Sequence, residues 1–304
     1  MSSLIEQAAK RLEQLRQAGV ELPEEAAPSQ SPPPAVAAAV AATPDAAVPA
    51  PTPLPPITSR KVELDLLAIS ASGIITPNAP RSAIADEYRI IKRPLISNAL
   101  GKGAAPVANG NLIIVTSALP GEGKSFTAIN LAMSMATELD TTVMLVDADV
   151  ARPSILSTLG LPPAPGLLDV LVNDSVDLSQ VLLKTNIDKL TILPSGTKQE
   201  RATELLASDA MVRLLEDMAS RYADRIIIFD SPPLLLTTEA RVLASHMGQV
   251  VLVVKAEETL QADVKHALSA LVDCPVKLMV LNQARSQPGV GYGYSYGYSY
   301  GERV

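Results

Sequence analysis

The chain has 304 residues, which is enough for one sizeable α/β domain with accessory segments. Aromatic residues make up only 3% of it and the net charge is −7, and both values argue against a nucleic-acid-binding surface. A single cysteine, Cys274, excludes a disulfide framework and a cysteine metal cluster. The two histidines, His246 and His266, are too far apart in sequence to suggest a histidine-rich metal centre.

The first part of the chain divides into a short helix and a tether. Residues 1–22 hold an amphipathic pattern from 4 to 18, which predicts either a frayed, solvated helix or a docking helix for a partner. Residues 23–60 are rich in alanine and proline and have no apolar period, so we expect a disordered, extended tether. Glu6 and Glu13 interrupt any signal-peptide pattern, and no apolar run is long enough to span a bilayer. These features predict a cytoplasmic chain.

Residues 61–288 carry the alternating pattern of an α/β domain. Uniformly apolar runs predict strands that are buried on both faces of a mostly parallel sheet, at 112–115, 143–146, 190–193, 226–229, 250–254 and 278–281. Helical patterns that would flank this sheet lie between them, at 124–139, 207–221 and 262–271.

The segment from Ser117 to Ser125 reads SALPGEGKS and lies between a predicted strand and a predicted helix. This is the context of a phosphate-binding loop, in which glycines turn backbone N–H groups toward a phosphate and the helix N-terminus attracts negative charge. Lys124 would reach the β- and γ-phosphates and Ser125 would bind Mg²⁺. Ala118 stands where the usual pattern has glycine, so a plain glycine-rich turn remains the alternative.

Three aspartates follow two of the other predicted strands. Asp147 and Asp149 come after the strand at 143–146, and Asp230 comes after the strand at 226–229. Carboxyl ends of parallel strands meet in the crevice where such sheets bind ligands, so these side chains suit Mg-ATP and proton transfer. The alternatives are that one of the first two caps a following helix, and that Asp230 belongs to a turn before Pro232.

Residues 289–304 form a low-complexity tail. Glycine and serine separate five of the seven tyrosines of the chain, so we expect this segment to be mobile and exposed. A mobile segment suits a substrate that enters an active site, and the alternative is an unmodified aromatic sticker segment. The five tyrosines are Tyr292, Tyr294, Tyr296, Tyr298 and Tyr300.

In this combination the PGEGKS loop, the Asp-x-Asp pair, the Asp-Ser-Pro-Pro segment and the tyrosine tail resemble the bacterial tyrosine autokinases of exopolysaccharide synthesis. The likeness covers most of residues 61–288 and the tail. The stretches MSSLIEQAAKRLEQL, EYRIIKRPLI and RYADRIIIFDSPPLL are similar to the cytoplasmic branch associated with exosortase gene clusters. The resemblance implies a P-loop NTPase fold, protein-tyrosine kinase activity, and ATP and Mg²⁺ as cofactors.

The resemblance also implies roles for single residues. Asp147 would accept the proton of the incoming tyrosine, Asp149 and Asp230 would hold the metal with Ser125, and Lys124 would act in catalysis. The tail tyrosines would be the phosphate acceptors. The nucleotide would contact Pro120, Gly121, Glu122, Gly123, Lys124, Ser125, Phe126, Arg152 and Asn282, the last of these at the adenine.

The family places an acidic–Arg–basic motif at the interface of a ring-like homo-oligomer. The matching residues here are Asp86, Arg89 and Lys92, for which a solvated helical face is the alternative. An integral membrane polysaccharide co-polymerase, or chain-length determinant, would activate the kinase and recruit it to the inner face of the plasma membrane. A protein-tyrosine phosphatase is a further partner that the family allows.

Two other functions fit part of the pattern. The first is a positioning or partitioning ATPase, although Leu119 stands where those relatives carry an additional lysine. The second is a non-catalytic ATP-binding scaffold, against which the intact Lys124, Asp147, Asp149 and Asp230 argue.

Overall fold

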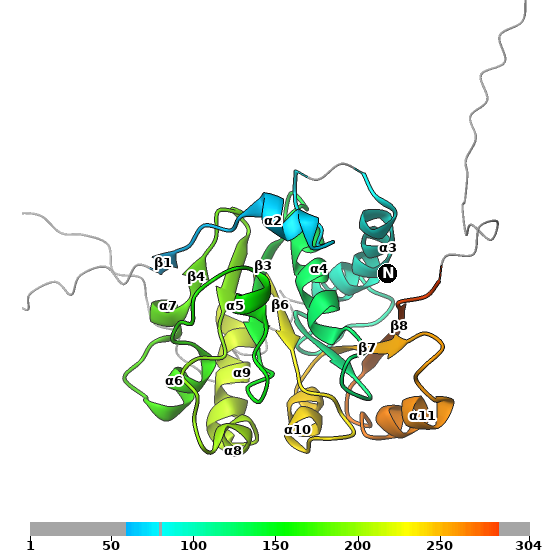
Figure 1. Ribbon diagram of the computed structural model, residues 1–304. Helices are drawn as coiled ribbons and strands as arrows, with labels where there is room; N and C mark the ends of the chain where they lie inside the picture. The colour runs from blue at the N-terminus through cyan, green and yellow to red at the C-terminus, as the bar shows by residue number, and fades with distance from the viewer. Residues whose placement is uncertain (1–58, 79–80, 286–304) are drawn as a thin grey trace, which may run out of the picture. The chain divides into compact units, whose positions relative to one another are not determined.

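The structure, a computed structural model, describes residues 59–78 and 81–285. An eight-stranded sheet runs through this part of the chain in the order β1-β4-β5-β3-β6-β2-β7-β8 (Figure 1). All neighbouring strands are parallel except β4 and β5. The strands are β1 (Arg60–Lys61), β2 (Leu112–Ser117), β3 (Thr142–Asp147), β4 (Leu183–Lys184), β5 (Leu190–Leu193), β6 (Arg225–Asp230), β7 (Gln249–Lys255) and β8 (Val276–Asn282).

The expected fold, a mostly parallel sheet flanked by helices, is confirmed, and all six predicted strands belong to it. The two strands that the sequence pattern did not predict, β1 and β4, have two residues each, which is too short for an apolar period. The predicted helix and tether at 1–60 and the predicted tail at 289–304 lie outside the described residues, except for residues 59 and 60.

Helices cover both faces of the sheet (Figure 1). The predicted helix 124–139 ends at Ala136, and the predicted helix 207–221 begins at Asp209, where the hydroxyl of Ser208 accepts from the N–H of Met211. The helices are α2 (Leu66–Ala71), α3 (Ala83–Ala99), α4 (Lys124–Ala136), α5 (Ile155–Thr158), α6 (Leu167–Val172), α7 (Leu178–Val181), α8 (Ala202–Leu206), α9 (Asp209–Arg221), α10 (Glu239–Ser245) and α11 (Gln261–Ser269).

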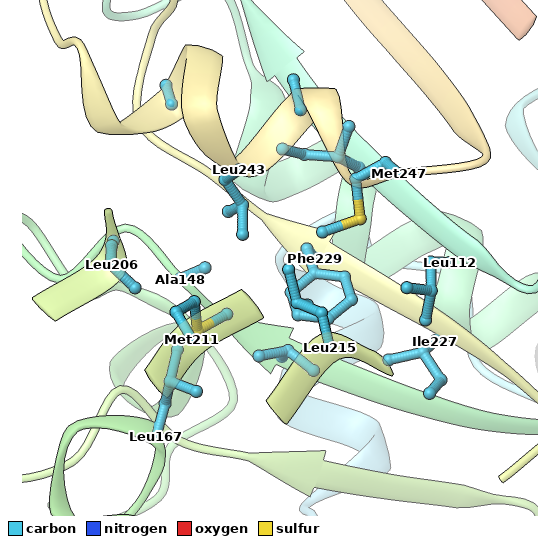
Figure 2. Close-up of a cluster of buried hydrophobic side chains, with 14 of the residues drawn as sticks. Leu112, Ala148, Leu167, Leu206, Met211, Leu215, Ile227, Phe229, Leu243 and Met247 are labelled. Carbon is cyan, nitrogen blue, oxygen red and sulfur yellow. The ribbon is translucent and has the colours of Figure 1, made fainter. Parts of the chain in front are cut away.

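Successive residues of the central strands contribute side chains alternately to two hydrophobic cores, one on each face of the sheet. On β2, Leu112 and Ile114 belong to the core shared with α6 to α11, while Ile113 and Val115 belong to the core shared with α2 to α5. Figure 2 shows part of the first core, where Phe229 of β6 is completely buried. Burial on both faces explains why these strands are uniformly apolar.

The prediction of burial on both faces is wrong for β8. This strand lies at the edge of the sheet, and its residues alternate between partly buried and exposed. Leu278 and Val280 pack against the core that contains α4, whereas Met279 and Leu281 are 61% and 64% exposed. The apolar run therefore marks a strand without showing that both of its faces are covered.

In residues 59–78 and 81–285, no helix combines the length and the apolar character that a bilayer crossing requires.

A buried glutamine joins α3 to β7, the strand next to the edge strand β8. The side chain of Gln249, at the start of β7, donates to the carbonyls of Leu95 (3.0 Å) and Gly110 (2.6 Å). It accepts from Asn98 at 3.0 Å. Because Gln249 is fully buried, no water replaces these bonds.

We predict that Gln249→Met lowers the free energy of unfolding by about 2–4 kcal/mol, because it leaves buried carbonyls without a donor. Urea denaturation measures this change. The matched control is Gln261→Met at the exposed start of α11, which is expected to stay within about 0.5 kcal/mol of the parent. Equal midpoints for the two variants would contradict the prediction.

Candidate nucleotide-binding and catalytic site

The loop between β2 and α4 has the backbone geometry of a phosphate cradle. Gly121 and Gly123 have φ angles of 82° and 94°, in the left-handed region that favours glycine. A Cβ on Gly123 would also lie 2.1 Å from the side-chain nitrogen of Asn282. No side chain caps the start of α4, so its first N–H groups are available to an anion.

The side chain of Glu122 braces this loop from within. Glu122 is only 3% exposed, and one carboxylate oxygen accepts from the N–H of Leu119 at 2.7 Å. The other oxygen accepts from the hydroxyl of Thr259, which follows β7. The backbone carbonyl of Glu122 accepts from Asn282, at the end of β8, at 2.8 Å. The loop is therefore fixed by its own carboxylate and by the two strands at the edge of the sheet.

The three predicted aspartates come together at the carboxyl ends of β3 and β6. These strands are direct neighbours, and their register sets Asp147 opposite Asp230. Asp149 lies two residues beyond β3 and forms an ion pair with Lys124, with 2.6 Å between the ammonium and the carboxylate. All three carboxylates are almost fully buried. The structure thus brings a lysine and three acids from distant parts of the sequence into one place.

Asp147 has two different carboxylate oxygens. Oδ2 accepts from the N–H groups of Ser154 (3.1 Å) and Ile155 (3.0 Å) at the start of α5, so the capping alternative from the sequence holds for this residue. Oδ1 is buried and has no hydrogen-bond partner among the described residues. Burial raises the pKa of Asp147 to about 6, against the lowering effect of the two N–H bonds. Oδ2 thus stabilises the start of α5, and Oδ1 is available to accept a proton.

Asp230 is fully buried, and neither of its carboxylate oxygens has a partner among the described residues. Burial raises its pKa to about 7, although the nearby Lys124 lowers it. A buried carboxylate without donors is costly, and a divalent cation would satisfy it. Asp230 and Asp149 therefore fit Mg²⁺ in chemical terms.

No three His, Cys, Asp or Glu side chains within residues 59–78 and 81–285 are arranged to hold a metal ion by themselves. Mg²⁺ commonly binds through one or two carboxylates together with phosphate oxygens and waters. Ser125, in the first turn of α4, is the hydroxyl that such loops supply.

The other predicted nucleotide contacts have mixed positions. Pro120 and Gly121 are exposed at the tip of the loop, and Phe126 is partly buried against the core on the α3 side. The side chain of Arg152 is exposed, and its backbone N–H donates to Asp149 at 3.2 Å. Asn282 contacts the loop backbone, as described above. The structure therefore places Arg152 and Asn282 beside the site.

The structure separates the predicted interface residues of α3. Asp86 and Arg89 form a half-exposed ion pair on the surface. Lys92 has a side chain that is only 4% exposed, because its ammonium donates to the carbonyl of Ser134 (2.5 Å) and pairs with Glu138 (2.8 Å). This corrects the expectation for Lys92, which ties α3 to α4 within the chain.

A cavity of about 240 Å³ opens beside Asp147. Sequence reasoning missed it, because its walls come from the short helix α5 and from loops with no recognisable motif. Apolar residues dominate these walls, and Ser157, Ser195 and Gly196 complete them. The apolar residues are Pro153, Leu156, Leu161, Pro163 and Ala164.

A larger hollow of about 800 Å³ includes Thr142 and Arg225, the first residues of β3 and β6. It lies at the amino ends of strands whose carboxyl ends carry the aspartates, so it is not part of the candidate site.

Comparison with known proteins agrees with this geometry. The family model described as the AAA domain matches residues 110–283, which is more than half of the chain. The tyrosine-protein kinase YwqD of Bacillus subtilis is 31% identical over 223 residues, covering 73% of this chain and 90% of that protein. The chain belongs to the AAA-domain family and to the bacterial tyrosine-protein kinases. The resemblance to these kinases inferred from the motifs is therefore confirmed.

Two further proteins are similar. The succinoglycan biosynthesis transport protein ExoP of Rhizobium meliloti is 29% identical over 225 residues, which are 72% of this chain but only 27% of ExoP. The crystal structure of the chimerical protein CapA2B2 matches with a TM-score of 0.58 and 27% identity, covering 73% of this chain and 93% of that one.

Because the pKa of Asp230 is raised, we predict that replacing its carboxyl group with a neutral amide stabilises the fold by an amount that depends on pH. The folded chain holds this proton up to about pH 7, whereas the usual aspartate pKa is 3.8, so wild-type stability falls as pH rises between those values. In nucleotide-free protein with chelator, Asp230→Asn is expected to raise Tm above pH 7 by at least about 2–4 °C and to have little effect near pH 4.

Thermal unfolding at several pH values measures this difference. Asp224→Asn is the matched control. Asp224 lies directly before the amino end of β6, whereas Asp230 lies at its carboxyl end, and the side chain of Asp224 is 73% exposed. A Tm change in Asp230→Asn that is the same at all pH values would contradict the prediction.

Proposed function

We propose that the protein is an ATP-dependent protein-tyrosine kinase that phosphorylates the C-terminal tyrosines of its neighbour in a homo-oligomer. The observation that carries this proposal is the position of Asp147. Its partner-free oxygen belongs to the cluster with Lys124, Asp149 and Asp230, and the same residue lines an apolar cavity. A phosphate donor on one side and a phenol on the other would both reach this carboxylate.

On the donor side, the N–H groups of the loop and of the α4 N-terminus bind the phosphates of ATP, and Lys124 adds its positive charge. Ser125, Asp149 and Asp230 would hold Mg²⁺, which neutralises charge that develops on the transferred phosphoryl group. The brace from Glu122 fixes the loop before the nucleotide arrives, so little reorganisation is needed during transfer.

On the acceptor side, the apolar walls of the cavity suit an aromatic ring, and Asp147 suits its hydroxyl. With a pKa of about 6, Asp147 is mostly ionised at neutral pH and can accept the phenol proton. As the phenol oxygen attacks the γ-phosphorus, that proton passes to Asp147 and the bond to the β-phosphate oxygen breaks, which releases ADP.

The proposed acceptors are Tyr292, Tyr294, Tyr296, Tyr298 and Tyr300, which lie outside the described residues. The segment 289–304 can extend about 50 Å, which is enough to reach a neighbouring subunit. The exposed pair of Asp86 and Arg89 supports a contact between subunits in a ring.

We also infer that the kinase regulates exopolysaccharide polymerisation or export, with an integral membrane co-polymerase as activator. The similarity to ExoP, named a succinoglycan biosynthesis transport protein, supports this role. Such a partner would recruit the chain to the inner face of the plasma membrane.

Incubation of the full chain with Mg-ATP, followed by mass spectrometry, tests the activity. We predict phosphotyrosine between residues 292 and 300 in the wild type, and at least about 100-fold less in Lys124→Met, because the phosphates lose their cation. The control is Lys265→Met on the exposed surface of α11, which keeps wild-type labelling. Phosphate release without labelled tyrosine would favour the ATPase alternative and contradict the kinase proposal.

A second prediction separates Asp147 from nucleotide binding. Asp147→Asn keeps an oxygen for the N–H groups of Ser154 and Ile155 but loses the proton acceptor. We expect the rate of tail phosphorylation to fall about 10²–10⁴-fold, while the affinity for a fluorescent ATP analogue stays within about threefold. Stopped-flow fluorescence and quantitative mass spectrometry give the two values. A parallel loss of nucleotide affinity would show that Asp147 acts on ATP instead.

A further inference from the structure

We propose that Asp169 is a positioning residue that shapes the acceptor cavity by joining the two loops of its outer wall. This inference rests on the proposed kinase function. Asp169 lies in the first turn of α6 and does not line the cavity itself. Its effect would therefore pass through the backbone of other residues.

The outer wall of the cavity comes from two chain segments that are far apart in sequence. Leu161, Pro163 and Ala164 belong to the segment that leads into α6, and Ser195 and Gly196 follow β5. Neither segment is a helix or a strand, so neither has regular hydrogen bonds to hold its shape. Two backbone bonds link these segments where α6 begins, because the N–H groups of Leu167 and Leu168 donate to the carbonyls of Pro194 (2.8 Å) and Ser195 (3.0 Å). Gly196 and Thr197 lie beyond these two bonds.

Asp169 extends this connection to Thr197 through a single carboxylate oxygen. Oδ2 accepts from the N–H of Gly166 at 2.8 Å and from the N–H of Thr197 at 2.9 Å. Partial burial raises the pKa of Asp169, but the bonds from Gly166 and Thr197 outweigh this effect and lower it. The residue is thus ionised at neutral pH, and its charge strengthens both bonds.

The backbone around Asp169 fits this role closely. A Cβ on Gly166 would lie 2.0 Å from the carbonyl oxygen of Pro194, so only glycine allows the two segments to approach this far. Gly196 has a φ of 94°, and a Cβ there would lie 2.5 Å from Oδ2 of Asp169. The carboxylate occupies the space that the missing side chain leaves.

A plain helix-capping role would need only the bond to Gly166, at the start of α6. The bond to Thr197 spans 28 residues and adds nothing to the helix. It fixes the chain directly after Gly196, whereas Ser195 is also held by the N–H of Leu168. Loss of this bond is therefore expected to weaken binding of the acceptor and to leave the ATP side unchanged, since the carboxylate of Asp169 accepts from Gly166 and Thr197, which lie outside the phosphate loop.

The test uses the full chain with its five tail tyrosines changed to phenylalanine and a synthetic peptide of residues 288–304 as the acceptor. Asp169→Ala is expected to raise the KM for the peptide about tenfold or more and to keep the KM for ATP within twofold. Asp169→Asn retains an acceptor oxygen and is expected to restore the peptide KM to within about threefold of the parent.

Two further variants separate the wall from the helix cap. Thr197→Pro removes the N–H of residue 197 together with the threonine hydroxyl, and its effect on the peptide KM is expected to match that of Asp169→Ala. Asp177→Asn, at the exposed cap of α7, is the matched control and leaves both KM values unchanged. Thermal unfolding of each variant identifies any chain that fails to fold, in which case Thr197→Pro decides.

Equal changes in the KM for ATP and for the peptide, or an unchanged peptide KM in both Asp169→Ala and Thr197→Pro, would overturn the role of Asp169. A parent chain that fails to phosphorylate the peptide at all would instead overturn the proposed function, and this inference with it.

Discussion

The parallel pairing of β3 with β6 is the constraint on which the candidate site depends. Its register sets Asp147 opposite Asp230, and the chain beyond β3 brings Asp149 to Lys124. Burial of three carboxylates raises the energy of their charged forms, and a single lysine compensates them only in part. The fold thus holds an excess of negative charge next to a loop built for phosphate, and a bound cation would relieve it.

The features that were predictable from the sequence are those with a local signal. Apolar runs predict the buried strands, and residue spacing predicts the glycine loop. The shared position of the three aspartates is predicted by the rule that the carboxyl ends of parallel strands meet at the same edge of a sheet. The predicted helix 207–221 starts before α9, which begins at Asp209. The break between α8 and α9 is short, and the cap at Ser208 is its main local sign in the sequence.

Other features needed the structure because they depend on contacts between distant residues. The burial of Lys92 results from the packing of α3 on α4, so its pattern in the sequence looks like that of any surface lysine. The sequence allowed that either Asp147 or Asp149 caps a helix, but the choice of Asp147 and the cavity beside it depend on local conformations that no periodicity encodes. The exposure of β8 depends on its place at the edge of the sheet.

The hydrogen bond from the side chain of Asn282 to the carbonyl of Glu122 links the end of β8 to the phosphate loop. β8 ends at Asn282, so the last residue of this strand is one hydrogen bond away from the backbone of the loop. Asn282 thus couples the end of the edge strand to the loop that would hold the nucleotide.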